Sequence, residues 1–209
     1  MINILLDLDQ TLISAEVLQE DEDDIDEEYD EEIYDIDEYK MKAINFDFEN
    51  MDNYYVIFAR PGLQKFLDFL FANFNVSVWT AASKDYAMFI IEKMILMNKP
   101  ERKLDYVFCS YHCKITDKVK NGTKDLSILW DKYKLPGYNK NNTYILDDYD
   151  EVYETQPDNC IIAEPFYFTH DESEKDDFLP KLTRKLSKLK KRMSNNDGSV
   201  TKILNEDKI

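Results

Sequence analysis

Several features that mark common protein classes are missing from this 209-residue sequence. No apolar run approaches the roughly 18 residues that a membrane-spanning helix needs, so we expect neither a transmembrane protein nor a membrane partner. The opening residues lack basic residues ahead of their short apolar run, which argues against a secretory signal peptide. Three cysteines are too few, and odd in number, for a disulfide framework. These absences favour an intracellular protein, without distinguishing nucleus from cytoplasm.

Basic residues are also scarce, with 26 against 43 acidic residues and a net charge of −17. The acidity is local, because residues 16–52 hold 18 acidic and two basic residues, a net charge of −16, and the remainder carries only −1. Surfaces that bind DNA are usually basic, so bare nucleic acid is not an expected partner. The Asn-, Ile-, Lys-, Asp- and Tyr-rich composition hints at an AT-rich genome, for instance a viral one.

The length fits one domain with a sizeable core. We expect this domain to span residues 1–193, with an acidic, mobile insert at 16–53 and a basic C-terminal helix at about 175–193. The remaining residues, 194–209, are expected to form a frayed tail. The sequence does not indicate an oligomeric state.

Short apolar runs followed by polar residues predict buried parallel strands. Three runs are predicted in this way: Ile2–Leu6, Val76–Trp79 and Thr143–Leu146. The further strand candidates are Tyr54–Phe58, Tyr106–Cys109 and Cys160–Ile162. Helical spacing appears between them, from Leu63 to Phe74, after a predicted N-cap at Ser83, and from Leu126 to Tyr133. This alternation predicts an α/β fold with a mainly parallel central sheet, in which ligands bind beyond the carboxyl ends of the strands.

Carboxylates follow two of the predicted strands. Asp7 and Asp9 flank Leu8 after the first strand, where one carboxylate can attack an electrophile and the other can handle protons. Such neighbouring groups repel each other, which raises a pKa or requires a cation between them. Asp147 and Asp148 end another apolar strand and add two more carboxylates. These strand ends therefore form the predicted site.

Other residues that could bind a metal have a structural interpretation. Cys109, His112 and Cys113 superficially suggest zinc, but a full set of ligands is missing. Arg60 and Trp79 are also interpreted as structural residues.

The segment Asp7–Leu12 resembles motif I of the haloacid dehalogenase superfamily of phosphotransferases. Further motifs follow in order: Arg60-Pro61-Gly62, Val78-Trp79-Thr80-Ala81, Lys124-Asp125-Leu126-Ser127, Ile145-Leu146-Asp147-Asp148 and Gln156-Pro157-Asp158-Asn159. This order is similar to that of the RNA polymerase II C-terminal-domain phosphatases and their small, NLI-interacting-factor-like relatives. The resemblance covers roughly residues 1–14 and 54–168. It implies a haloacid-dehalogenase-like Rossmannoid three-layer fold with a small insert after the first strand.

The resemblance also implies four catalytic roles. Asp7 would be the nucleophile that forms an aspartyl-phosphate, and Asp9 would be the general acid and base. Thr80 would hydrogen-bond the phosphoryl oxygens. Lys124 would neutralise the phosphoryl charge and steady Asp7.

The cofactor that the resemblance implies is Mg²⁺, which prefers oxygen ligands. Asp7 and Asp148 would bind it directly, together with the backbone carbonyl of Asp9. Asp147 would hydrogen-bond nearby or act in the outer coordination shell.

The resemblance therefore predicts a Mg²⁺-dependent phosphoserine or phosphothreonine protein phosphatase, with the polymerase C-terminal domain as a candidate substrate. A small-molecule phosphatase of the same superfamily and a catalytically silent peptide-binding module are the alternatives.

Gln10 stands where the family often has glutamate, which bears on substrate preference. The Asp147-Asp148 pair is typical of the larger polymerase phosphatases. The acidic insert could be a solvated loop, could steer basic substrates, or could cover the phosphate site as an inhibitor.

Overall fold

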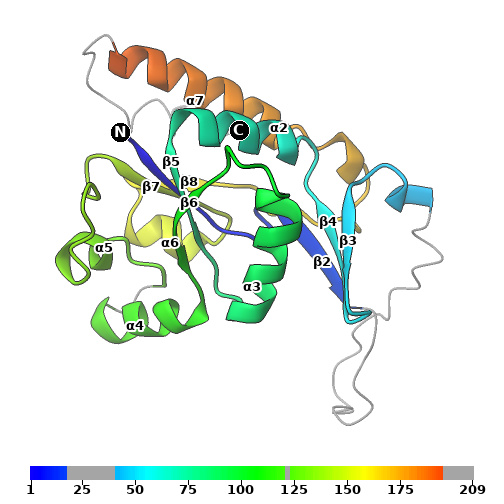
Figure 1. The fold of residues 1–209 in the computed structure, drawn as a ribbon, viewed down its shortest axis with the longest axis horizontal. Helices are drawn as coiled ribbons and strands as arrows, with labels where there is room; N and C mark the ends of the chain where they lie inside the picture. The colour runs from blue at the N-terminus through cyan, green and yellow to red at the C-terminus, as the bar shows by residue number, and fades with distance from the viewer. Residues whose placement is uncertain (18–40, 121–122, 195–209) are drawn as a thin grey trace.

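A five-stranded sheet forms the centre of the protein in a computed structural model that describes residues 1–17, 41–120 and 123–194 (Figure 1). The strands lie in the order β6-β5-β1-β7-β8, and every pairing is parallel. They are β1 (Asn3–Leu6), β5 (Asn75–Trp79), β6 (Leu104–Phe108), β7 (Thr143–Asp147) and β8 (Cys160–Ile162). Each coincides with a strand predicted from the sequence, to within two residues at either end.

Alternate residues of the central strand β1 enter two separate cores, because successive side chains of a strand point to opposite faces of its sheet. Ile4 and Leu6 belong to a large core on one face, whereas Leu5 belongs to a second core on the other. None of the three is more than 1% exposed. The apolar run Ile4–Leu6 is therefore what a strand covered on both faces requires.

Helices cover both faces of the sheet and produce three layers. The large core is covered by α2 (Leu63–Asn73), α3 (Lys84–Ile90), its π-helical continuation η1 (Ile91–Leu96) and α7 (Phe178–Ser194). The second core is covered by α4 (Ser110–Lys120), α5 (Ser127–Asp131) and α6 (Asp150–Thr155). Figure 1 shows α2 and α7 running side by side along one edge of the molecule. The predicted α/β fold with a mainly parallel central sheet is confirmed.

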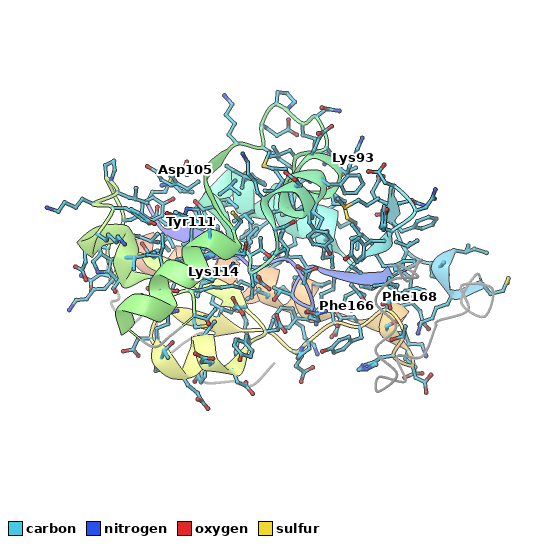
Figure 2. All side chains as sticks on the ribbon, turned by 90° about the horizontal axis from the view of Figure 1, so that it is seen from below. Lys93, Asp105, Tyr111, Lys114, Phe166 and Phe168 are labelled. Atoms are coloured by element: carbon cyan, nitrogen blue, oxygen red, sulfur yellow. The ribbon has the colours of Figure 1, made fainter. Side chains whose placement is uncertain are left out.

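A second, antiparallel sheet lies beside the central one, with the order β2-β4-β3. Its strands are β2 (Ile13–Val17), β3 (Phe48–Met51) and β4 (Tyr55–Ala59). Strand β3 falls within the predicted insert at 16–53, so the C-terminal part of that segment pairs with the domain, while residues 18–40 lie outside the described residues. One face of this sheet is covered by Phe166 and Phe168 from the segment after β8 (Figure 2), and Phe168 stacks on Phe58 with ring centroids 3.6 Å apart.

Helix α7 corresponds to the predicted basic helix, but it begins at Phe178, after a 3-10 turn, η2 (Ser173–Lys175). Leu179, Leu182 and Leu186 are buried in the large core, whereas Lys181 and Lys188 are exposed. The helix is thus amphipathic, with a basic outer face. Residues 195–209 of the predicted tail lie outside the described residues. Within the part of the chain that the structure describes, no helix has the length and apolar character needed to cross a membrane.

Arg60, which follows β4, ties the segment before α7 to the loop after β1. Its Nε and Nη2 donate to Oδ1 and Oδ2 of Asp176 at 2.9 and 2.7 Å. Its Nη1 donates to the backbone carbonyls of Thr11 and Glu164 at 3.1 and 2.9 Å. A bidentate pair of this kind fixes orientation as well as charge. Arg60 is 1% exposed and has the structural role that the sequence predicts.

We expect Asp176→Asn to lower the free energy of unfolding by about 3 kcal/mol, because the buried guanidinium would keep its charge and lose its counter-ion. Denaturant unfolding followed by circular dichroism measures this change. Glu172→Gln is the matched control, since Glu172 and its partner Lys175 are both largely exposed and their pairing should leave stability unchanged. Equal stabilities for the two variants would mean that the backbone carbonyls alone hold Arg60.

Candidate active site

Strands β1 and β7 bring three carboxylates together at their carboxyl ends. Leu6 is paired with Leu146, so Asp7 and Asp147 follow side by side, and the amide of Asp7 donates to the Leu146 carbonyl at 2.9 Å. The ligand oxygens of Asp7, Asp147 and Asp148 all lie within 4.8 Å of one another. Asp7 and Asp147 are buried, at 5% and 0% exposure. The strand register therefore forms the acidic cluster, as the sequence predicts.

Lys124 reaches this cluster from the segment between α4 and α5. Its Nζ donates to Oδ1 of Asp7 at 2.5 Å and to Oδ2 of Asp147 at 2.8 Å. Burial disfavours the ammonium ion, but the charges of Asp7 and Asp147 outweigh burial and raise the pKa of Lys124 above its usual range. The lysine therefore stays charged and bridges two carboxylates.

The backbone of Lys124 is left-handed, with φ of 57°, which is uncommon for a residue other than glycine. Two hydrogen bonds hold it in this conformation. Its amide donates to Oγ1 of Thr116 at 3.1 Å, and its carbonyl accepts from Nε2 of Gln156 at 3.0 Å. The surrounding structure thus fixes the lysine in place.

Thr11 links two of the carboxylates from the turn after β1. Its hydroxyl lies 2.8 Å from Oδ1 of Asp148 and 3.3 Å from Oδ2 of Asp7. Since a hydroxyl has one proton, it donates to one of them at a time, and the shorter contact favours Asp148. The sequence assigns no role to Thr11 beyond its place in the motif, and only the fold shows this contact.

Asp9 lies at the edge of the cluster and contacts a different partner. The hydroxyl of Tyr86 donates to its Oδ1 at 2.6 Å. The pKa of Asp9 is raised to about 6, because burial and the negative charge of Asp7 raise it by more than the hydrogen bond from Tyr86 lowers it. An acid of this strength can both give and take a proton near neutral pH.

Thr80 follows β5 at the same edge of the central sheet and is 1% exposed. Its hydroxyl accepts a hydrogen bond from the Ala82 amide at 3.0 Å, which orients the side chain within the turn. Lys124 contacts Asp7 and Asp147 directly, and Thr11 links Asp148 to Asp7. The hydrogen bond that the Thr80 hydroxyl accepts lies within its own turn. Thr80 is therefore held by its own loop.

The balance of charge indicates what the site can bind. Burial raises the pKa values of Asp147 and Asp148, and the charge of Asp7 adds to both shifts. Lys124 supplies one positive charge against these carboxylates, so the cluster favours a further cation. Opposite ligands of an octahedral Mg²⁺ lie about 4.2 Å apart, which fits oxygens that are all within 4.8 Å. The residues that are present therefore suit a hard divalent cation.

This acidic cluster is the one group of three or more potential metal ligands found among residues 1–17, 41–120 and 123–194. The Cys109–Cys113 segment has a different role. His112 accepts a hydrogen bond from the Cys109 amide through Nδ1 at 3.1 Å, and the Cys113 thiol is directed at the Thr80 carbonyl, 3.7 Å away. These contacts support the structural interpretation of that segment.

A family model described as NLI interacting factor-like phosphatase matches residues 2–197. The chain belongs to this family. The match extends over nearly all of the chain, so the family resemblance drawn from the ordered motifs is confirmed. The acidic cluster and Lys124 both lie inside the matched region.

Two viral proteins are similar to this family member over most of both chains. The putative CTD phosphatase-like protein 355R of Invertebrate iridescent virus 6 is 46% identical over 185 residues, which cover 87% of this chain and 95% of the relative. The protein of the same name from Invertebrate iridescent virus 3 is 38% identical over 192 residues, covering 90% and 96%.

A solved structure with a similar fold is that of Fcp1, described as an essential RNA polymerase II CTD phosphatase. The TM-score is 0.61 with 16% identity, and the match covers 98% of this chain and 70% of Fcp1. At this identity the similarity shows a shared fold, and the chemistry of the family member must be inferred from its own residues.

Proposed function

We propose that this protein is a Mg²⁺-dependent phosphoserine and phosphothreonine protein phosphatase that acts through an aspartyl-phosphate on Asp7. The observation that carries the proposal is the position of the Asp7 carboxylate, 2.5 Å from Lys124 and inside a cluster with Asp147 and Asp148. A buried, oriented carboxylate beside a fixed cation is suited to attack an anionic phosphate, whose approach needs charge neutralisation.

In the first step one oxygen of Asp7 attacks phosphorus, the bond from phosphorus to the serine oxygen breaks, and Asp9 gives its proton to that oxygen. In the second step Asp9 takes a proton from water, and the water oxygen displaces Asp7 and releases phosphate. Lys124 keeps Asp7 in position and offsets negative charge in both steps. The Thr80 hydroxyl would hydrogen-bond the phosphoryl oxygens.

Asp7, Asp148 and the backbone carbonyl of Asp9 would hold Mg²⁺, with Asp147 beside them. When bound, the ion neutralises phosphoryl charge and lets an anionic nucleophile approach. Thr11 orients Asp148 through its hydroxyl, and Lys124 orients Asp147. The chain therefore contributes a prepared set of oxygen ligands.

The substrate class rests on the relatives. The viral relatives carry the name CTD phosphatase-like, and Fcp1 is described as an RNA polymerase II CTD phosphatase. Phosphorylated serine in a peptide, with the polymerase C-terminal domain as the first candidate, is the substrate that these similarities favour.

We expect kcat/KM for a phosphoserine peptide from the polymerase C-terminal domain to exceed that for a nucleoside monophosphate by about a hundredfold or more, since peptide contacts remote from the phosphate add binding energy. Phosphate release from both substrates and from p-nitrophenyl phosphate measures this. A preference for nucleotides or sugar phosphates would favour a small-molecule phosphatase. A folded protein that releases phosphate from no substrate would favour the silent peptide-binding module.

A further inference from the structure

Tyr86 reaches Asp9 from a different part of the fold. It lies in the first turn of α3, the helix that follows β5, and its hydroxyl donates to Oδ1 of Asp9 at 2.6 Å, 77 residues away in the chain. The aromatic ring packs at the border of the large core, so the residue combines an apolar body with a polar tip. A helical spacing of apolar residues explains the ring, but not the contact of its hydroxyl.

Two contacts place Tyr86, one through its backbone and one through its ring. The amide of Tyr86 donates to Oγ of Ser83, the residue that caps α3, at 3.4 Å. Its ring meets the ring of Tyr55 in β4 edge to face, with centroids 5.5 Å apart and an angle of 75° between the planes. The hydroxyl is thus presented to Asp9 by a helix on one side and by the small sheet on the other.

The hydrogen bond has one direction. A phenol keeps its proton near neutral pH, so the Tyr86 hydroxyl is the donor in this contact. Oδ1 of Asp9 is therefore the acceptor. A carboxyl group has two oxygens, and a proton that Asp9 carries is left to the second, Oδ2.

We propose that Tyr86 is a positioning residue that fixes the rotation of the Asp9 carboxyl group and assigns proton transfer to Oδ2. This inference rests on the proposed function, in which Asp9 protonates the leaving oxygen. During the reaction the proton moves from Oδ2 to the leaving oxygen as its bond to phosphorus breaks, and the proton of Tyr86 stays on the phenol. A carboxyl group that is free to rotate would present Oδ2 in the productive orientation for a smaller fraction of the time.

The test uses the dependence of rate on the leaving group. Strongly acidic phenols leave without help, whereas weakly acidic phenols and serine need a proton from the enzyme. We expect Tyr86→Phe to lower kcat/KM for phenyl phosphate by about tenfold to a hundredfold, but that for p-nitrophenyl phosphate by less than about threefold. The plot of log kcat/KM against the leaving-group pKa, over a series of substituted phenyl phosphates of similar size, becomes steeper.

Two further variants separate positioning from loss of structure. Tyr133→Phe also removes one phenolic hydroxyl, but from a ring that packs against the second core, and should leave the slope unchanged. In an Asp9→Asn background, Tyr86→Phe should not steepen the slope further, because the group that it positions can no longer donate the proton.

If Tyr86→Phe loses activity equally for all leaving groups, or loses none, the proposed role of Tyr86 is overturned. The proposed function would still stand in that case, provided that wild-type turnover depends on Asp7. If the wild-type protein hydrolyses none of the phenyl phosphates, the proposed function fails and this inference fails with it. A steeper slope for Tyr86→Phe alone supports both.

Discussion

Replacing Asp7 by asparagine is expected to lower kcat by about 10⁴-fold or more, on the scale seen when a covalent nucleophile is removed from an enzyme. Asparagine has nearly the same shape and keeps an oxygen that can accept a hydrogen bond from the Thr11 hydroxyl or from the Lys124 ammonium group. Its amide nitrogen is not a nucleophile, and its oxygen is a weak one. Steady-state hydrolysis of p-nitrophenyl phosphate measures the loss.

The matched control is Asp105→Asn, because Asp105 is exposed on β6 and accepts a hydrogen bond from Tyr138 at 3.2 Å, which asparagine also accepts. This variant should keep wild-type activity. Rapid quenching followed by mass spectrometry should find phosphate on the peptide that contains Asp7, and on no peptide of Asp7→Asn. Activity of Asp7→Asn above about a tenth of wild type would require another nucleophile.

Removal of divalent cations is expected to have the second-largest effect, about 10³-fold on kcat, because the site opposes several carboxylates with a single lysine. Addition of Mg²⁺ should restore activity. It should also raise the melting temperature, since an ion that binds only the folded state at 100 times its Kd stabilises it by about 2.7 kcal/mol. For a chain of this size we expect a rise of roughly 5–10 °C.

Asp148→Asn should reduce both the activation by Mg²⁺ and the rise in melting temperature, because it removes one anionic ligand. Asp150→Asn is the control, since Asp150 is exposed in the first turn of α6 and lies outside the cluster. It should keep the full Mg²⁺ response. A melting temperature of the wild-type protein that does not change at millimolar Mg²⁺ would contradict a metal site in this cluster.

The strands and the acidic cluster can be predicted from the sequence because their signals are local. Each of Ile2–Leu6 and Thr143–Leu146 is a short, mainly apolar run that is followed by aspartate, and parallel strands place such ends at one edge of a sheet. Lys124 is harder to predict, because Lys114, Lys118 and Lys120 are close in the sequence. Its choice depends on the resemblance of the Lys124–Ser127 segment to a family motif.

The contacts around Asp9 cannot be predicted in this way. Tyr86 fits the apolar spacing of a helix, and no local pattern shows that its hydroxyl reaches a carboxylate 77 residues earlier in the chain. Strands β2 and β3 are missed for a related reason. Ile13–Val17 and Phe48–Met51 each mix apolar and polar residues, and their pairing with β4 decides their structure.

The position of β1 in the central sheet has a consequence for biosynthesis. Asn3 is paired with Asn75 on one side and with Thr143 on the other, so β1 is synthesised well before either of its neighbours in the sheet. Until β7 has emerged, an apolar strand has an open edge, which slows folding and invites aggregation. The residues around Asp7 include Lys124 and Asp147. A nascent chain that ends before Lys124 therefore carries the proposed nucleophile without the lysine that would hold it in position.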